Sequence, residues 1–343
     1  MKKILGISLL LLLIVAGVVA WVFLGSGTGF SQQKETLYIP TGTSSEQQLI
    51  DSVQRKGIFS NTSAFRFLAN RMGYWSNIRA GRYEIKKGTS LVNIMRMLRN
   101  GQQTPVNFVI TKLRTKEDLA RQAGAKFEFD STAMSVLLQA DDSLTKFGVT
   151  SEVAMSKVLP DTYTFLWNTT PEKIYARLAA ESKKFWTPAR EQQARVKGLT
   201  PLQVIIIASI VDEETNAAAE RGNVASVYLN RVAVGMPLQA DPTVKFALKD
   251  FGLKRIYSKH LSFESPYNTY RNKGLPPGPI CTPSRKTIDA VLAAPITKYL
   301  YFVASPKFNG THEFSETYTE HLQKARLYQQ ALNRQDSIRK NLL

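Results

Sequence analysis

Three consecutive carboxylates, at positions 212–214, end an unusually apolar stretch of the sequence. Between residues 202 and 211 the only polar side chains are Gln203 and Ser209, a pattern typical of a helix that is buried on all sides. A carboxylate at the C-terminal end of a helix meets the negative end of the helix dipole, which disfavours its charged form. Because a protonated carboxyl can donate a proton to a leaving oxygen, the sequence offers a candidate general acid here.

Helical spacing distinguishes the three acids, because residues three, four and seven positions apart share a helix face. Glu214 follows apolar residues at positions 207, 210 and 211, whereas Asp212 follows Ser209 and Ala208. An apolar wall raises a carboxyl pKa by desolvation, so Glu214 is predicted to be the catalytic acid. The alternative is that all three acids lie in solvent at a helix end and have no chemical role, as charge runs usually do.

The helix that carries these acids has a clear predicted start. Thr200 and Gln203 have the spacing of a capping box, and the proline between them suits the first helical position. A second helix is predicted to begin near Glu220 and Arg221 and to end at Gly235. The sequence therefore predicts two helices that follow each other around the candidate acid.

Loops downstream of these helices have the composition of a carbohydrate cleft. Residues 238–243 form a predicted turn rich in hydrogen-bonding groups, residues 265–270 place two tyrosines around an amide, and residues 274–279 form a stiff proline-glycine loop. Sugars expose apolar faces ringed by hydroxyls, so aromatic platforms and amides suit them. The alternative is that these tyrosines and prolines are packing residues. The candidate substrate-binding residues are Gln239, Tyr267, Asn268 and Tyr270.

The N-terminus carries an apolar segment of membrane-spanning length. Residues 4–25 contain no charge and only Ser8 as a polar side chain, which is enough for a helix to cross a bilayer. Lys2 and Lys3 precede it, so they are expected in the cytoplasm and the rest of the chain outside. A cleaved signal peptide is the alternative, with small residues at 18–20. The apolar run continues to Leu24, which favours an uncleaved anchor.

Composition narrows the class of protein further. The 343 residues suffice for two or three domains, and the net charge is +18. The basic residues are spread along the chain, and an exported protein has no genome to read, so nucleic acid is not expected as a partner. Anionic lipid or wall polymer suits the charge. Cys281 is the only cysteine, and three histidines are scattered, so neither a disulfide nor a metal or other cofactor is expected.

Periodicity predicts a small α+β module in the first part of the chain. Strands are expected at 36–40 and 82–85, each followed by a Gly-Thr-Ser and a helix, with a further helix at 64–72. A strand at 106–110 and a helix at 117–122 follow, and residues 125–157 are too weakly patterned to assign.

The second part of the chain is predicted as mixed α and β structure. Residues 160–167 are expected to be extended, and an amphipathic helix should run from Pro171 to Phe185. Near the end, a strand at 298–304, a turn at Asn309 and a return strand at 312–314 precede a helix at 319–333. His312 and His321 are expected to be structural or exposed.

A series of short motifs resembles those of one bacterial family. They are 208–211, 214–215, 220–221, 224–227, 230–231, 235–236, 238–239, 241–244, 267–270, 274–280 and 299–304. With them the chain looks like the YceG/MltG-like membrane-anchored endolytic murein transglycosylases, which cut peptidoglycan glycan strands at the outer face of the cytoplasmic membrane. The resemblance covers essentially the whole chain and is strongest from 158 to 320. The family's catalytic glutamate falls on Glu214.

The resemblance implies an α+β protein in five parts. These are a cytoplasmic N-terminus and transmembrane anchor at 1–25, a linker at 26–35, a LysM-like module at 36–104, a connecting α+β region at 105–157 and a catalytic domain at 158–343. Asp241, Glu220 and Arg221 are expected to support the site. The implied partners are peptidoglycan glycan strands, the cytoplasmic (inner) membrane and peptidoglycan synthases. The sequence departs from the family at 281–284, where Cys-Thr-Pro-Ser replaces the usual Asn-Pro-Gly.

The implied reaction needs only one carboxylate. Glu214 would protonate the oxygen between N-acetylmuramic acid and N-acetylglucosamine, and would then deprotonate the muramic C6 hydroxyl, which closes a 1,6-anhydro ring. A lysozyme-like hydrolase is the first alternative, because Asp241, Glu220 and Glu264 offer a second carboxylate. A wall-binding scaffold without catalysis is the second.

Overall fold

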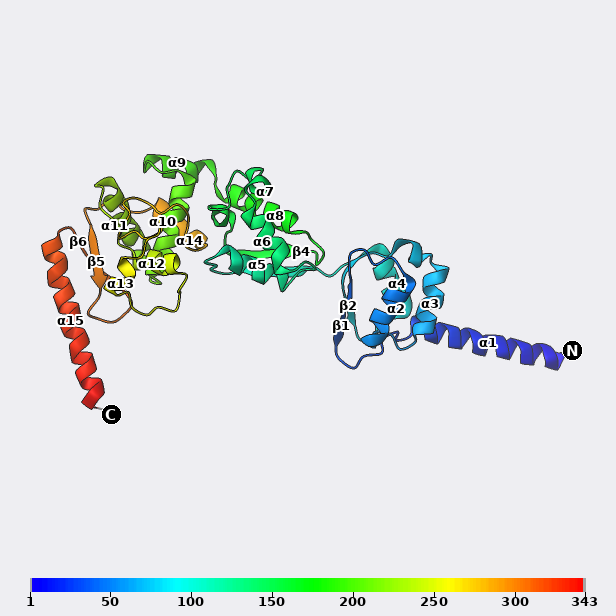
Figure 1. The fold of residues 1–343 in the computed structure, drawn as a ribbon. Helices are drawn as coiled ribbons and strands as arrows, with labels where there is room; N and C mark the ends of the chain where they lie inside the picture. Colours follow the sequence, from blue (N-terminus) through cyan, green and yellow to red (C-terminus); the bar gives the residue numbers. More distant parts are fainter. Residues whose placement is uncertain (1, 342–343) are drawn as a thin grey trace. The chain divides into compact units, whose positions relative to one another are not determined.

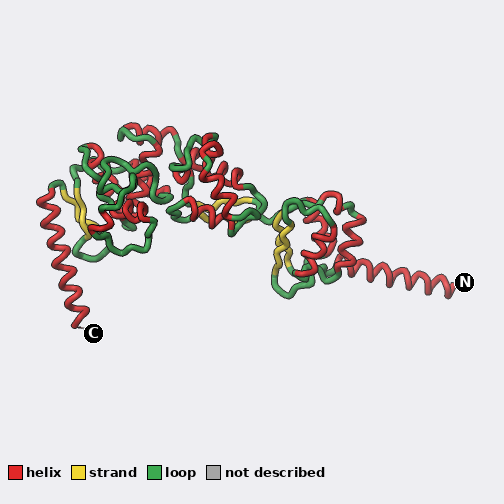
Figure 2. The backbone as a smooth tube through the Cα atoms, viewed as in Figure 1, coloured by secondary structure: helices red, strands yellow, loops and turns green. Residues whose placement is uncertain are grey.

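The structure is a computed structural model, and it describes residues 2–341 (Figure 1). The chain forms two compact units of mixed α and β structure, as expected for the α+β class (Figure 2). The first unit contains the chain up to Phe108 together with Gly124–Asp130 and Tyr163–Thr170. The second contains Val109–Ala123, Ser131–Thr162 and the chain from Pro171 onward. Two later segments therefore return to the first unit, and the predicted boundaries at 104 and 157 stay predictions.

Aromatic contacts explain this return. Phe127 lies 5.4 Å from Phe108 and 5.7 Å from Phe165 between ring centroids, and Trp167 lies 4.9 Å from Tyr38. Such rings bury much apolar area each. The first unit therefore recruits residues that a linear division of the sequence assigns elsewhere.

The apolar N-terminal segment is a helix, α1 (Lys2–Leu24). Its stretch from Lys3 to Leu24 has a mean hydropathy of 2.9 and is long and apolar enough to cross a membrane. A membrane anchor and a signal segment both have this composition.

The segment after α1, predicted as a linker, makes backbone contacts with the rest of the first unit. Bridges join Ser26 to Ser90 and Thr28 to Phe59, and the Gly27 amide donates to the Thr89 carbonyl at 3.0 Å. A Cβ at Gly27 would stand 2.7 Å from the Leu91 backbone nitrogen. The glycines here permit close backbone approach, which the sequence alone does not distinguish from flexibility.

The first unit contains the predicted α+β module. Strands β1 (Lys34–Ile39) and β2 (Gly81–Lys86) pair antiparallel, with Leu37 opposite Tyr83. Both side chains are fully buried. The helices are α2 (Glu46–Arg55), α3 (Thr62–Arg71), the 3-10 turn η1 (Tyr74–Asn77) and α4 (Leu91–Asn100). Ser45 and Ser90 cap α2 and α4 through their side chains. The strands and helices predicted for this module are confirmed.

The middle of the chain contains one confirmed strand and a group of short helices. Strand β3 (Val106–Ile110) lies where it was predicted and pairs with β4 (Asp161–Phe165), within the stretch predicted to be extended. The helices are α5 (Lys116–Gly124), α6 (Ser131–Gln139), α7 (Asp141–Thr145), η2 (Ala154–Lys157) and α8 (Pro171–Phe185). Helices α6 and α7 and the turn η2 occupy the stretch that the sequence left unassigned.

Helix α10 (Pro201–Glu214) forms the core of the second unit, and Figure 1 shows it among α11, α12 and α14. The neighbouring elements are α9 (Pro188–Val196), η3 (Ala218–Glu220), α11 (Arg221–Ala233), α12 (Asp241–Leu248), α13 (Ser258–Leu261), α14 (Arg285–Leu292), β5 (Tyr301–Ala304), β6 (His312–Ser315) and α15 (Tyr318–Asn341). Strands β5 and β6 pair antiparallel as predicted. Helix α12 replaces the second half of the predicted turn at 238–243, and α9 and α14 were not predicted.

Candidate active site

The capping box of α10 forms as the sequence predicted. The backbone amide of Gln203 donates to the Thr200 hydroxyl at 3.2 Å, and the backbone amide of Thr200 donates to the side-chain oxygen of Gln203 at 2.8 Å. All residues of α10 from Val204 to Asp212 are buried. The helix is therefore fixed at its start and enclosed by the core, which fixes where its three C-terminal acids emerge.

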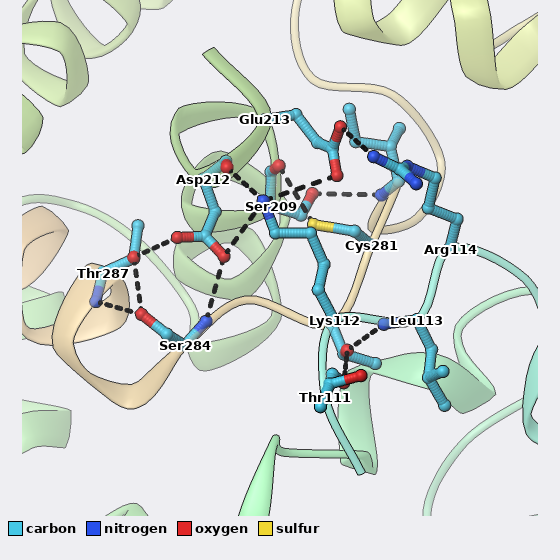
Figure 3. Close-up of polar contacts among 12 residues, drawn as sticks. Thr111, Lys112, Leu113, Arg114, Ser209, Asp212, Glu213, Cys281, Ser284 and Thr287 are labelled. Atoms are coloured by element: carbon cyan, nitrogen blue, oxygen red, sulfur yellow. Dashed lines mark hydrogen bonds and ion pairs between the residues drawn. The ribbon is translucent and has the colours of Figure 1, made fainter. Parts of the chain in front are cut away.

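Asp212 is the most buried of the three acids, with 6% of its surface exposed. Its carboxylate accepts hydrogen bonds from the Thr287 hydroxyl and from the Ser284 amide. Lys112 and Arg221 each place a nitrogen 3.8 Å from it. Figure 3 shows Asp212 facing Thr287 and Ser284 on one side and Lys112 on the other. These contacts compensate the buried charge, which gives Asp212 a structural role.

Glu213 is also paired with cations. Arg114 lies 2.9 Å and Lys112 3.6 Å from its carboxylate oxygens (Figure 3). Lys112 also donates to the Asp212 backbone carbonyl, a group that the end of a helix leaves unsatisfied. The segment after β3 thus supplies two basic side chains that hold the end of α10.

Glu214 differs from its two neighbours, because no ion pair of Glu214 occurs among the described residues. Its Oε2 atom is buried without a hydrogen-bond partner there. The pKa of Glu214 is raised to about 7, mainly by burial and to a smaller extent by the nearby Asp241 charge, while the charges of Lys245 and Arg231 lower it in part. The helix-face comparison predicted this raised pKa. Glu214 is therefore able to hold a proton near neutral pH.

Asp241 begins α12 and receives a hydrogen bond of 2.6 Å from the Tyr270 phenol. Gln239, two residues earlier, is exposed and has a φ of 50°, a left-handed conformation that costs a residue with a Cβ about 1 kcal/mol. The backbone amide of Gln239 donates to the Thr269 carbonyl at 3.1 Å. The structure thus joins two of the predicted loops, at 238–241 and 267–270, beside Glu214.

Asn268, predicted as a substrate-binding residue, lies inside the protein. It is fully buried, and its amide group donates to the carbonyls of Leu261 and Phe263 at 2.9 and 2.7 Å and accepts from the Tyr270 amide at 3.0 Å. These bonds occupy the side chain. Asn268 therefore shapes the loop that carries the two tyrosines, and its contact with substrate stays a prediction.

Tyr267 is partly buried and packs against Phe246, with ring centroids 4.7 Å apart. Burial, with a smaller contribution from the Glu152 charge, raises the pKa of its phenol to about 12. The proline-glycine loop contacts it at Gly278, where an added Cβ would lie 2.9 Å from the Tyr267 hydroxyl. The absence of a side chain at Gly278 therefore permits this position of Tyr267.

Comparison with known proteins identifies the family. The model of the YceG-like family matches residues 37–327. The chain belongs to the YceG-like family. It is 30% identical over 311 residues to an endolytic murein transglycosylase of Bacillus subtilis (strain 168), and the match covers 85% of this chain and 84% of that protein.

Two further relatives agree with this assignment. An endolytic murein transglycosylase of Streptococcus pneumoniae serotype 2 is 27% identical over 304 residues, which cover 80% of this chain but only 55% of the longer pneumococcal protein. The crystal structure of a yceG-like protein from Listeria monocytogenes is 26% identical and matches with a TM-score of 0.57, over 85% of this chain and 99% of that one.

Glu220, predicted as a supporting residue, contacts Thr215, the residue that follows Glu214. Its carboxylate accepts hydrogen bonds from the Thr215 hydroxyl at 2.6 Å and from the His312 amide at 2.9 Å, and it bonds the His312 ring at 2.7 Å. Burial raises the pKa of Glu220, but the bonds from Thr215 and His312 outweigh it and lower the pKa. His312 is thus structural, as predicted.

Cys281 and Ser284 belong to the network in Figure 3 and lie in the segment 281–284, where the sequence departs from the usual family pattern. The Cys281 thiol donates to the Ser209 carbonyl at 3.3 Å, and the Thr282 hydroxyl accepts from the Leu113 amide at 2.9 Å. Ser284 caps α14 and reaches Asp212. This segment therefore ties α10 and α14 to the chain around Leu113.

Sequence reasoning missed the basic residues around the acids. Lys112 and Arg114 precede Glu213 by about a hundred residues, and nothing in their local pattern distinguishes them from other surface cations. Arg231 is buried and donates to the carbonyls of Leu300 and Leu238, both at 2.7 Å. Arg231 belongs to the Asn-Arg motif at 230–231, but only the structure shows that it holds these carbonyls near Glu214.

Proposed function

We propose that this protein is a lytic transglycosylase that cleaves peptidoglycan glycan strands internally, between N-acetylmuramic acid and N-acetylglucosamine. The observation that carries the proposal is the difference between Glu214 and the two acids before it. Asp212 and Glu213 are paired with cations, whereas Glu214 has a pKa of about 7 and a buried, unpartnered Oε2 atom. The names of its relatives in the YceG-like family support the choice of substrate.

In the first step, protonated Glu214 gives its proton to the glycosidic oxygen as the bond to the muramic anomeric carbon breaks. The N-acetylglucosamine side leaves with that proton. In the second step, the Glu214 carboxylate removes the proton of the muramic C6 hydroxyl, whose oxygen attacks its own anomeric carbon. The products are a 1,6-anhydro end and a regenerated acid, and no water is consumed.

Asp241 has a supporting part in this scheme. Its negative charge raises the pKa of Glu214, and its carboxylate is oriented by Tyr270. The same exposed carboxylate carries the second candidate function, a lysozyme-like hydrolase, if it activates a water molecule. The two functions differ in their products, because hydrolysis leaves a reducing muramic end.

We further propose that α1 is an uncleaved anchor, so that both units act outside the cytoplasmic membrane. The apolar length of α1 and the lysines before it support this orientation. The compact α+β module of the first unit supports its assignment as the LysM-like module. Peptidoglycan synthases, which make the strands, are the proposed protein partners.

Product analysis tests the proposed reaction. The chain from about Ser26 onward is incubated with purified glycan strands, and the fragment ends are identified by mass spectrometry. We expect 1,6-anhydro-N-acetylmuramic ends, with mid-length fragments appearing before disaccharides because the cuts are internal. Reducing muramic ends would support the hydrolase, and binding without cleavage would support the scaffold.

A further inference from the structure

A cavity of about 640 Å³ lies in the second unit, and Glu214 is not among the described residues that line it. Tyr267 and Phe246 form part of its wall, and they also pack against each other. Tyr267 belongs to the loop whose Tyr270 bonds Asp241, and Phe246 belongs to α12, which begins at Asp241. The cavity and the Glu214 site therefore share one loop and one helix.

The cavity is lined by charges of both signs. Three cations and three acids contribute to it, namely Arg114, Lys116, Lys249, Glu117, Asp141 and Glu152. Some of these charges are held in place by bonds within the wall. Lys116 donates to the Ser151 hydroxyl at 2.5 Å, and the Ser151 amide donates to Asp141 at 2.6 Å.

Glu117 and Lys249 illustrate how these charges are arranged. Burial raises the pKa of Glu117, but hydrogen bonds from its own backbone amide and from Thr115, with the charges of Lys249 and Lys116, lower it overall. Lys249 follows the last residue of α12 as its C-terminal cap and has a φ of 56°, a conformation that glycine or asparagine usually adopts at a helix end. A long cationic side chain thus stands at the cavity wall despite an unfavourable backbone conformation.

We propose that this cavity binds the short peptide that substitutes the muramic acid of the glycan strand. The inference rests on the proposed function and adds a second recognition element to it. Such a peptide carries free carboxylates and, at its diamino acid, an ammonium group. Carboxylates suit Lys116 and Lys249, and an ammonium suits Glu152. Neutral sugar rings need none of these charges, and the cavity volume is in the range of small-ligand sites.

The test compares two substrates that differ in the peptide, whose removal leaves a free lactyl carboxylate on each muramic acid. Strands that keep their peptides and strands stripped by an amidase are cleaved by the wild type, by Lys249→Glu and by Glu152→Lys. The control for Lys249→Glu is Lys286→Glu, which makes the same charge change on an exposed residue of α14 that does not line the cavity. We expect both cavity variants to lose about tenfold in kcat/KM on peptide-bearing strands, the loss typical of one charge-assisted hydrogen bond.

On stripped strands both cavity variants should match the wild type, and the control should match it on both substrates. Equal losses on the two substrates would overturn the proposal, because they would indicate a sugar subsite or a structural role. Unchanged cleavage of both would overturn it as well.

A binding measurement separates this proposal from the proposed function. Calorimetric titration of the wild type with a free muramoyl peptide should give a Kd that rises about tenfold in Lys249→Glu. If the wild type cleaves no strand but shows this difference, the proposed reaction fails and the peptide site stands. If it cleaves strands but binds no peptide, the reverse holds.

Discussion

The Tyr270 phenol donates a 2.6 Å hydrogen bond to the Asp241 carboxylate. This bond orients the one acid whose charge raises the pKa of Glu214. Asp241 therefore influences the proton on Glu214 from a distance, while burial makes the larger contribution. The pair links the start of α12 to the loop at 265–270, so the position of a tyrosine affects the acid that performs the chemistry.

The pH profile should report the proton on Glu214. A general acid is active when protonated, so kcat/KM should fall as pH rises through about 7, the raised pKa of Glu214. In Asp241→Asn the neighbouring negative charge is lost, which lowers the pKa of Glu214 and should move the falling limb to lower pH. The profiles are measured with stripped glycan strands. A limb that stays in place would show that Asp241 does not act on Glu214.

Tyr270→Phe should keep the ring and lose only the bond to Asp241. A hydrogen bond to a charged group contributes about 2 kcal/mol, so kcat/KM should fall by roughly tenfold or more while the fold is unchanged. The matched control is Tyr267→Phe, since no hydrogen bond of the Tyr267 phenol occurs among the described contacts. Equal effects of the two variants would indicate that the rings matter and the Asp241 bond does not.

Removing the charge of Asp212 and removing the charge of Glu214 should change the stability of the protein in opposite directions. Asp212→Asn leaves Lys112 and Arg221 without their buried partner and should lower the free energy of unfolding by about 3 kcal/mol. Glu214 has a raised pKa in the folded state, so its contribution to stability is present at low pH and is lost as pH rises through about 7.

Glu214→Gln removes that loss, so its melting temperature should exceed that of the wild type by more at pH 8 than at pH 5. Thermal denaturation at both pH values measures both variants. A destabilised Glu214→Gln at pH 8 would contradict the assignment of Glu214 as a desolvated acid.

Asn268→Ala should weaken activity through the loop and not through lost contact with substrate. The substitution frees the carbonyls of Leu261 and Phe263 and the Tyr270 amide, so the loop should become mobile and kcat/KM should fall at least tenfold. Hydrogen exchange of residues 261–270 measures the loop. Reduced activity with unchanged exchange would support the predicted direct contact with substrate.

The sequence predicted the helix of the site well, because local rules govern it. The capping box at Thr200 and the apolar run to Val211 determine where α10 starts and which side of it is desolvated. Helical spacing then distinguished Glu214 from Asp212 without any tertiary information. The raised pKa of Glu214 is the property that this spacing predicted.

Other parts of the site depend on contacts between distant residues. Lys112 and Arg114 reach Asp212 and Glu213 across about a hundred residues, and no local pattern predicts such pairs. Asn268 is a residue type common in sugar-binding sites, but in the structure its side chain donates hydrogen bonds to the backbone of its own loop. The start of α12 at Asp241 was predicted as a turn, although the proline that follows is a known helix-start signal.

Cleavage in water labelled with heavy oxygen tests most directly whether Glu214 acts alone and activates a sugar hydroxyl. Purified strands are cut by the wild type in the labelled water, and the fragments are weighed by mass spectrometry. We expect 1,6-anhydro ends with no heavy oxygen in any new end, and no cleavage above background by Glu214→Gln. One heavy oxygen in each new muramic end would contradict this expectation and would make Asp241 the base that activates water.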